Sequence, residues 1–246
     1  MIPIGDDNTR RRTVPWITWL LVAVNVAVFV FFEGFGNNQR FINAYSTVPA
    51  KVLTGRDIVT RDRVLVDPST GQRMLVPGLR HTPIPMWLTI ITGMFMHAGI
   101  AHIAGNMLYL LIFGDNIEDR LGHFRYLLFY LFCGVVASLA QIYATKLTNG
   151  NLLVPSLGAS GAIAGVLGAY LLLFPRNRVR VLVSWFIISV PAILAVGLWF
   201  LFQVVTELGV LGRDTQGGVA YAAHIGGFAV GFITVKLWAL GRRVWD

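Results

Sequence analysis

The chain has 246 residues, of which 55% are hydrophobic and only 13% are charged. Soluble domains carry about 25% charged residues, so the composition excludes an ordinary soluble protein and indicates a chain that crosses a membrane several times. The formal net charge of +8 falls in short segments between apolar runs, where positive charge sets membrane orientation. We therefore do not expect nucleic-acid binding.

A membrane-spanning helix needs about 20 mostly apolar residues. Six stretches meet or approach this requirement, which predicts an all-α fold of six transmembrane helices. In chain order they cover residues 16–32, 98–114, 124–144, 158–174, 179–204 and 218–240. The second and fourth are short and interrupted by polar residues or glycine, which a helix buried by protein tolerates better than one facing lipid. We expect functional residues in these two.

The first apolar run, residues 16–32, follows three arginines at positions 10–12, as a signal peptide would. It is too long for a typical signal core, and no A-x-A-like cleavage site follows it. We expect a retained first span, a cytoplasmic tail over 1–15 and a single membrane domain over 16–246. Further basic residues on the same side of a six-span arrangement are Arg120, Arg125, Arg176, Arg178, Arg180, Arg242 and Arg243. The positive-inside rule then places both termini in the cytoplasm.

A long outer loop, about residues 34–86, separates the first two spans, and most helix connections are far shorter. Within it, two short β-prone runs at 64–66 and 74–76 flank a Pro/Gly turn at 67–71, which predicts a hairpin. We expect an ordinary extramembrane loop, and contact with substrate or lipid is the alternative.

The second span carries His97, His102 and Asn106. Polar side chains in apolar spans are costly and are therefore candidates for function. His102 and Asn106, four residues apart, share one helix face, while His97 lies about where the helix begins. The pattern predicts hydrogen-bond donors aimed at one point.

The fourth span opens with Ser160, between Gly158-Ala159 and Gly161. A helix N-terminus offers free backbone N–H groups and the positive end of the helix dipole, which suit a developing oxyanion. Glycines on either side permit another backbone to approach. Taken alone, this motif is a weak signal, because a serine that only caps a helix is common.

The sixth span carries His224 on one face with Gly227 and Gly231, and small residues follow Ser160 along the fourth span in the same way. Small residues at this spacing let two membrane helices pack closely. The convergence predicts that Ser160 and His224 meet as nucleophile and base, with helix packing alone as the alternative.

Metal and paired-aspartate chemistry are not expected. His97 and His102 are five residues apart, no His-Glu-x-x-His occurs, and no Asp or Glu lies in the central part of any span. We therefore predict no metal and no cofactor. The missing acid also predicts that Ser160 and His224 act as a dyad without an anionic third member.

Four motifs, in order over about residues 86–240, give the chain its resemblance to a known family. They are His97-x4-His102-x3-Asn106, Gly114-x3-Glu118-x3-Gly122, Gly158-x-Ser160-Gly161 and Ala223-His224-x2-Gly227-x3-Gly231. With these motifs the sequence resembles the rhomboid family of intramembrane serine proteases. The resemblance implies a six-helix bundle of the basic prokaryotic form.

The resemblance also implies a role for each matching residue. Ser160 would attack, His224 would act as base and then acid, and His102, Asn106 and the Ser160 backbone N–H would hold the oxyanion. His97 matches a structural or solvent-retaining position. The matching glycines that would support the site are Gly158, Gly161 and Gly227.

Two features depart from the family pattern. A Trp-Arg pair in the first outer loop is replaced by Leu88-Thr89, with Trp87 one residue early. The family often has an aromatic residue four positions after the nucleophile, whereas this chain has Ala164. Stacking on His224 from that position is therefore excluded. Neither change removes a reacting group.

The expected activity is hydrolysis of peptide bonds in or near transmembrane segments of client proteins within the bilayer. We expect a bacterial or archaeal inner membrane, with the site open to the outer face. The alternatives are a catalytically inactive relative that binds transmembrane clients, and a transporter, since broken polar helices also line substrate paths. Retention of Ser160 and His224 argues against the first, and the lack of matching halves argues against the second. The oligomeric state does not follow from the sequence.

Overall fold

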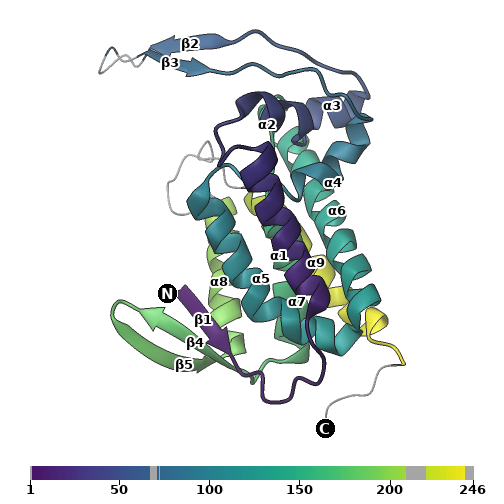
Figure 1. The fold of residues 1–246 in the computed structure, drawn as a ribbon, viewed down its shortest axis with the longest axis vertical. Coiled ribbons are helices and arrows are strands. Elements are labelled where there is room, and N and C mark those ends of the chain that lie inside the picture. Colours follow the sequence, from purple (N-terminus) through teal and green to yellow (C-terminus); the bar gives the residue numbers. More distant parts are fainter. Residues whose placement is uncertain (1, 67–70, 72, 209–219, 242–246) are drawn as a thin grey trace.

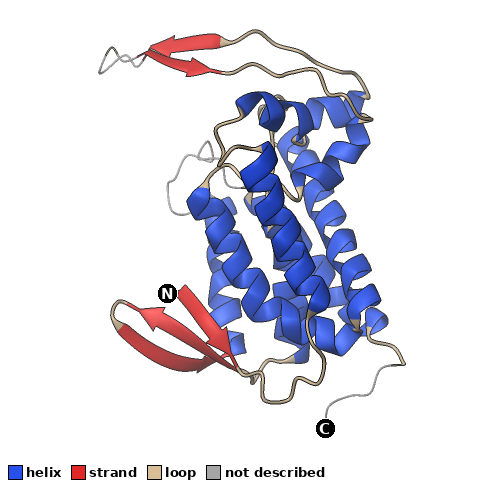
Figure 2. Cartoon of the chain, in the orientation of Figure 1, coloured by secondary structure: helices blue, strands red, loops and turns tan. Residues whose placement is uncertain are grey.

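The computed structural model describes residues 2–66, 71, 73–208 and 220–241. Figures 1 and 2 show a bundle of helices with small β-structures at its two ends. The long helices are α1 (Trp16–Ala27), which continues as the π-helical turn η1 (Val28–Phe32), α5 (Ile100–Leu121), α6 (His123–Leu147), α7 (Ser160–Leu173), α8 (Ala192–Glu207) and α9 (Tyr221–Trp238). Within the described chain, α5 and α6 are long and apolar enough to cross a bilayer.

The expected helix over 179–204 is wrong in its first half. Here β4 (Arg178–Val183) and β5 (Phe186–Pro191) form an antiparallel hairpin, and β4 also pairs with β1 (Ile2–Asp6) in the order β1-β4-β5. Val179 and Val181 are fully buried while Arg178 and Arg180 are exposed. This period of two is a strand pattern, and averaged hydropathy cannot distinguish it from a helical one.

The sheet also corrects the all-α expectation, which holds for the bundle but misses the strands at its ends. The first residues of the expected tail pair with β4, with Pro3 opposite Val181 and Asp6 opposite Val179. Of the expected last span, residues 218–219 lie outside the described part of the chain.

Glu118 on α5 determines where α1 begins. One carboxylate oxygen accepts the backbone N–H of Ile17 at 2.9 Å, and the other accepts the N–H and the hydroxyl of Thr18, each at 2.7 Å. The first N–H groups of a helix have no partner within it, and a negative charge there is favourable. A buried acid of one helix thus caps another.

The outer loop is folded. It contains α2 (Gln39–Tyr45), α3 (Pro49–Thr54) and the antiparallel pair β2 (Arg63–Val66) and β3 (Arg73–Val76), and it leads into the 3-10 turn η2 (Met86–Leu88) and α4 (Thr89–Gly93). The predicted hairpin is therefore confirmed, although positions 67–70 of its turn lie outside the described residues.

One buried lysine holds this loop together. The Nζ of Lys51 donates to Asp57 Oδ1 at 2.8 Å, to the carbonyl of Arg80 at 2.6 Å and to Thr82 Oγ1 at 2.8 Å. Burial alone would raise the pKa of the Asp57 carboxyl, but hydrogen bonds from Lys51, His81 and Thr82 hold that pKa below its ordinary value. The ammonium is thereby paired and satisfied, as a buried charge requires.

Helix α7 lies at the centre of the bundle, in contact with α5, α6, α8 and α9, and its residues 161–170 are all buried. Its contact with α9 depends on glycine, because a Cβ on Gly227 would lie 2.1 Å from the carbonyl oxygen of Gly161. A Cβ on Gly231 would likewise lie 2.0 Å from the carbonyl oxygen of Gly165. The two backbones therefore touch, and the first residue of α7 lies beside α9.

Candidate active site

Ser160 and His224 lie in hydrogen-bond contact. The Ser160 Oγ, at the first residue of α7, is 2.8 Å from the Nε2 of His224, one turn into α9. His224 is 9% exposed, and Ser160 is partly exposed. The close approach of α7 and α9 through their glycines brings together two residues that are 64 positions apart.

Gln203 on α8 contacts the other nitrogen of the same ring. Its Oε1 lies 2.7 Å from the Nδ1 of His224, and its side chain is buried. An amide oxygen only accepts hydrogen bonds, so Nδ1 carries the proton and Nε2 presents a lone pair to Ser160. This is the tautomer a general base needs. Sequence reasoning missed Gln203; the available signal was an amide inside an otherwise apolar span.

Aromatic rings from two helices flank His224. The Trp199 ring on α8 has its centroid 5.9 Å from that of His224, with an interplanar angle of 41°. Tyr221 meets the ring edge-on at 6.3 Å. Position 164 carries an alanine, so packing on the imidazole comes from α8 and α9 instead of α7.

The loop before Ser160 is held by two other segments. Ser156 and Thr47 of the outer loop exchange backbone hydrogen bonds of 2.8 and 3.0 Å. The N–H of Gly158 donates to the carbonyl of Gly93 at 2.8 Å. The outer loop and the segment preceding α5 thus position the start of α7.

Gly158 leaves room for His102. Its φ is +132°, and a Cβ there would lie 3.0 Å from the His102 Nε2 and 3.6 Å from the Ser160 Oγ. Both side chains therefore border the same small space. The backbone N–H of Ala98 donates to the His102 Nδ1 at 3.4 Å, so the ring proton is on Nε2, on the side of Gly158.

Asn106 lies one helical turn after His102 on α5 and is 8% exposed. Its Nδ2 is buried and has no hydrogen-bond partner among the described residues. Buried polar groups are nearly always paired, so this amide is a candidate hydrogen-bond donor. The Ser160 N–H, in the first turn of α7, also lacks an acceptor within its helix. His102 and the first turn of α7 thus lie beside Gly158, and Asn106 follows His102 by one turn on α5.

Glu33 was not predicted, and it supports the segment before α5. Its carboxylate, fully buried at the end of η1, accepts the backbone N–H of His97 with both oxygens at 3.0 Å. The His97 ring meets that of His102 edge-on at 5.1 Å. The sequence did contain a signal, since this acid directly follows an apolar run.

A metal would need several ligands at one place. Within the described part of the chain, no three His, Cys, Asp or Glu side chains come together as metal ligands would. Among the described residues, the Ser160 hydroxyl contacts the His224 imidazole, and the His102 imidazole lies on the other side of Gly158, groups suited to acyl transfer.

Comparison with known proteins shows the family of the chain. The Rhomboid domain matches residues 85–240, more than half of the chain. The chain belongs to the rhomboid family. The family is embedded in membranes as a helical bundle and includes intramembrane serine proteases.

Several curated rhomboid proteins are similar to this chain. Rhomboid protein 1, mitochondrial, of Saccharomyces cerevisiae is 33% identical over 88% of this chain and 51% of its own length. RHOMBOID-like protein 6, mitochondrial, of Arabidopsis thaliana is 33% identical over 91% of this chain and 69% of its own. Rhomboid protease GluP of Bacillus subtilis is 32% identical over 64% of this chain and 28% of its own. The chain spans about half the length of the first of these relatives.

Proposed function

We propose that this rhomboid protein is a serine endopeptidase that cleaves peptide bonds in or near the transmembrane segments of client proteins. The observation that carries the proposal is the 2.8 Å contact between Ser160 Oγ and His224 Nε2. A nucleophile within hydrogen-bond reach of a base, itself oriented by a third group, is the arrangement that nucleophilic catalysis requires.

In the proposed reaction, His224 Nε2 takes the hydroxyl proton as Ser160 Oγ bonds to the scissile carbonyl carbon. The carbonyl oxygen becomes an oxyanion and accepts hydrogen bonds from His102, Asn106 and the Ser160 N–H. The imidazolium then protonates the leaving amine as the C–N bond breaks, and an acyl-enzyme forms. Water activated by the same imidazole hydrolyses the acyl-enzyme and restores the hydroxyl.

Gln203 takes the place that an acid occupies in a triad. Its amide oxygen accepts the Nδ1 proton throughout the cycle and stabilises the imidazolium without a formal charge. A buried carboxylate would need a partner within the bundle, whereas an amide needs only hydrogen bonds. We therefore extend the expected dyad to three residues, in which His224 contacts both Ser160 and Gln203.

Client specificity is proposed to depend on helix stability. A transmembrane helix hides its carbonyl groups in internal hydrogen bonds, so a client must unwind locally before Ser160 can attack. Glycine, proline or polar residues in its span favour this unwinding.

The proposed topology has six spans within a single domain over residues 16–246, after a tail over 1–15. Both termini face the cytoplasm of a bacterial or archaeal cell, and the site opens to the outer face. The positions of the basic residues support this orientation.

Ser160→Ala tests the proposal against the parent, with a single-pass model substrate in detergent and a fluorophosphonate probe. Ser156→Ala is the matched control, because it removes a hydroxyl four positions away while keeping the backbone bonds to Thr47. We expect Ser160→Ala to lose cleavage and labelling and the control to keep both. Cleavage by Ser160→Ala at the parental rate would exclude the mechanism, and a parent that binds the substrate without cleavage or labelling would be an inactive client binder.

A further inference from the structure

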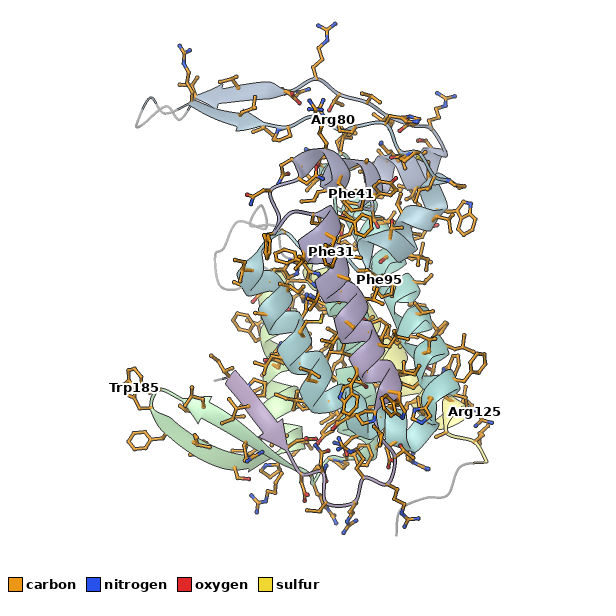
Figure 3. The ribbon with its side chains drawn as sticks, viewed as in Figure 1. Phe31, Phe41, Arg80, Phe95, Arg125 and Trp185 are labelled. Atoms are coloured by element: carbon orange, nitrogen blue, oxygen red, sulfur yellow. The ribbon has the colours of Figure 1, made fainter. Side chains whose placement is uncertain are left out.

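The β4–β5 hairpin exposes a cluster of apolar side chains at one end of the bundle. Figure 3 shows Trp185 at the tip of this hairpin, pointing away from the helices. The exposed fractions are 93% for Trp185, 74% for Phe186 and 64% for Ile187. Tryptophan and phenylalanine side chains at the edge of a membrane protein are typical of the lipid–water interface, where their rings are partly buried.

A basic hollow lies at the base of the same hairpin. It has a volume of about 560 Å³ and is lined by Pro175, Arg176, Arg178, Pro191 and Ile193. Both arginines are exposed, and in the described part of the chain no carboxylate forms an ion pair with either. Arg178 donates one hydrogen bond, to the carbonyl of Ser189 at 3.4 Å, which leaves most of its donors available. Guanidinium groups of this kind bind phosphate well.

The hollow continues into the apolar outer surface of α8. Ile193 belongs to both, and it is followed along the helix by Leu194, Leu198, Leu201 and Phe202, all at least 45% exposed. Such a surface on a family member embedded in the bilayer faces acyl chains. Positive charge therefore lies at the point where the acyl-chain surface of α8 ends.

We propose that the β4–β5 hairpin and the Arg176–Arg178 hollow form a binding site for an anionic phospholipid. The phosphate occupies the hollow and pairs with the two guanidinium groups, while the acyl chains lie along α8. Trp185 and Phe186 enter the interfacial layer beside the lipid. The charge complementarity and the continuity with α8 favour a lipid over a protein partner, and this inference is independent of the proteolytic function.

The test measures lipid retention by the purified full-length protein with native mass spectrometry. Delipidated protein in detergent is titrated with phosphatidylglycerol or with phosphatidylcholine. Each basic residue near an anionic lipid surface contributes about 1 kcal/mol, which corresponds to roughly fivefold in affinity. We expect the parent to prefer phosphatidylglycerol and the Arg176→Gln/Arg178→Gln variant to lose at least tenfold in its affinity for that lipid.

Two further variants separate charge from apolar contact. Arg176→Lys/Arg178→Lys keeps the charge, so it should keep the preference for the anionic lipid. Trp185→Ser/Phe186→Ser should weaken the binding of both lipids equally and leave the preference for the anionic lipid unchanged. The matched control is Arg63→Gln/Arg73→Gln, which removes the same charge from the other hairpin, at the opposite end of the bundle (Figure 1), and should bind as the parent does.

Four outcomes would overturn the proposal. One is equal retention of the two lipids by the parent, and another is unchanged retention in the Arg176→Gln/Arg178→Gln variant. The third is complete displacement of the lipid by inorganic phosphate at a concentration equal to that of the lipid, since the acyl chains would then contribute nothing and the hollow would be a site for free anions. A dimer that Trp185→Ser/Phe186→Ser dissociates would reassign the hairpin to a second copy of the chain.

Discussion

The imidazole of His224 lies between two side chains from different helices, and its contact with Gln203 on α8 is 2.7 Å long. The amide oxygen accepts from Nδ1, so the lone pair of Nε2 is directed at Ser160 Oγ. A neutral residue on a neighbouring helix thus sets the tautomer of the proposed base.

Gln203→Leu should lower kcat about fivefold with little change in KM, because one hydrogen bond of about 1 kcal/mol that orients the base is lost. The measurement is steady-state cleavage of a model substrate. Thr206→Val is the matched control, since among the described residues the Thr206 hydroxyl donates to the Phe202 carbonyl of its own helix alone. Equal kcat values for Gln203→Leu and the parent would show that packing alone orients His224.

Asn106→Ala should lower kcat by roughly 10²–10³, as removal of one oxyanion donor does in other acyl-transfer enzymes. The Asn106 Nδ2 has no partner in the described structure, so its loss leaves no other buried group unpaired. Thermal stability should therefore stay close to the parental value while kcat falls. A variant that loses stability and keeps its kcat would assign Asn106 a structural role.

Glu33→Ala should lower both stability and activity. The His97 N–H would be left buried without an acceptor, which costs about 1–3 kcal/mol in the free energy of unfolding. The segment that carries the Ala98 N–H, which orients His102, would also loosen. Glu33→Gln keeps one acceptor oxygen and should restore most of both, as seen in thermal unfolding and cleavage rates. A Glu33→Ala variant as stable as the parent would mean that the contact with His97 is not needed.

Gly227→Ala should separate α7 from α9. The new Cβ would lie 2.1 Å from the carbonyl oxygen of Gly161, and overpacking of this kind costs about 1–3 kcal/mol. We expect a lower Tm and loss of cleavage, because the hydrogen bond between Ser160 and His224 spans the same interface. Gly197→Ala is the control, since a Cβ at Gly197 meets nothing within 4 Å and alanine favours a helix. A Gly227→Ala variant as active as the parent would refute the close-contact argument.

Asp6 joins the β1 strand to the bundle through its Oδ2, which accepts from Tyr170 at 2.6 Å and from Asn116 at 2.7 Å. Its Oδ1 is buried without a partner among the described residues. Burial, with the nearby Asp115 charge adding to it, raises the pKa of the Asp6 carboxyl from 3.8 to about 7. The folded protein therefore holds a proton on Asp6 that the unfolded chain releases near its ordinary pKa.

The contribution of the raised Asp6 pKa to the free energy of unfolding is fully present below about pH 4 and is lost as the pH rises through about 7. Between pH 5.5 and 8, the Tm of the parent should fall more steeply than that of Asp6→Asn. Asp7→Asn is the control, because hydrogen bonds from Thr9 lower the pKa of Asp7, and it should keep the parental slope. Parallel Tm profiles for Asp6→Asn and the parent would contradict the assignment.

The sequence alone determined the residues that the fold brings together around Ser160, and the reason is local chemistry. Histidine, serine and asparagine are rare within apolar spans, and glycine spacing is visible in the chain itself. These signals predict Ser160, His224, His102 and Asn106 as site residues, and the structure brings the first three of them close together. The hairpin of the outer loop could also be predicted from the sequence, because its turn residues and β-prone runs are adjacent in the chain.

Only the tertiary structure decided which neighbours complete the site. Gln203 and Glu33 acquire their roles from helices that lie next to α9 and α5, and no local pattern specifies those contacts. The same holds for β4 and β5, since an apolar run with alternating residues fits either a helix or a strand until β1 supplies a pairing partner. Spacing along the chain predicts the face on which a residue lies, whereas the group opposite that face depends on how the whole bundle packs.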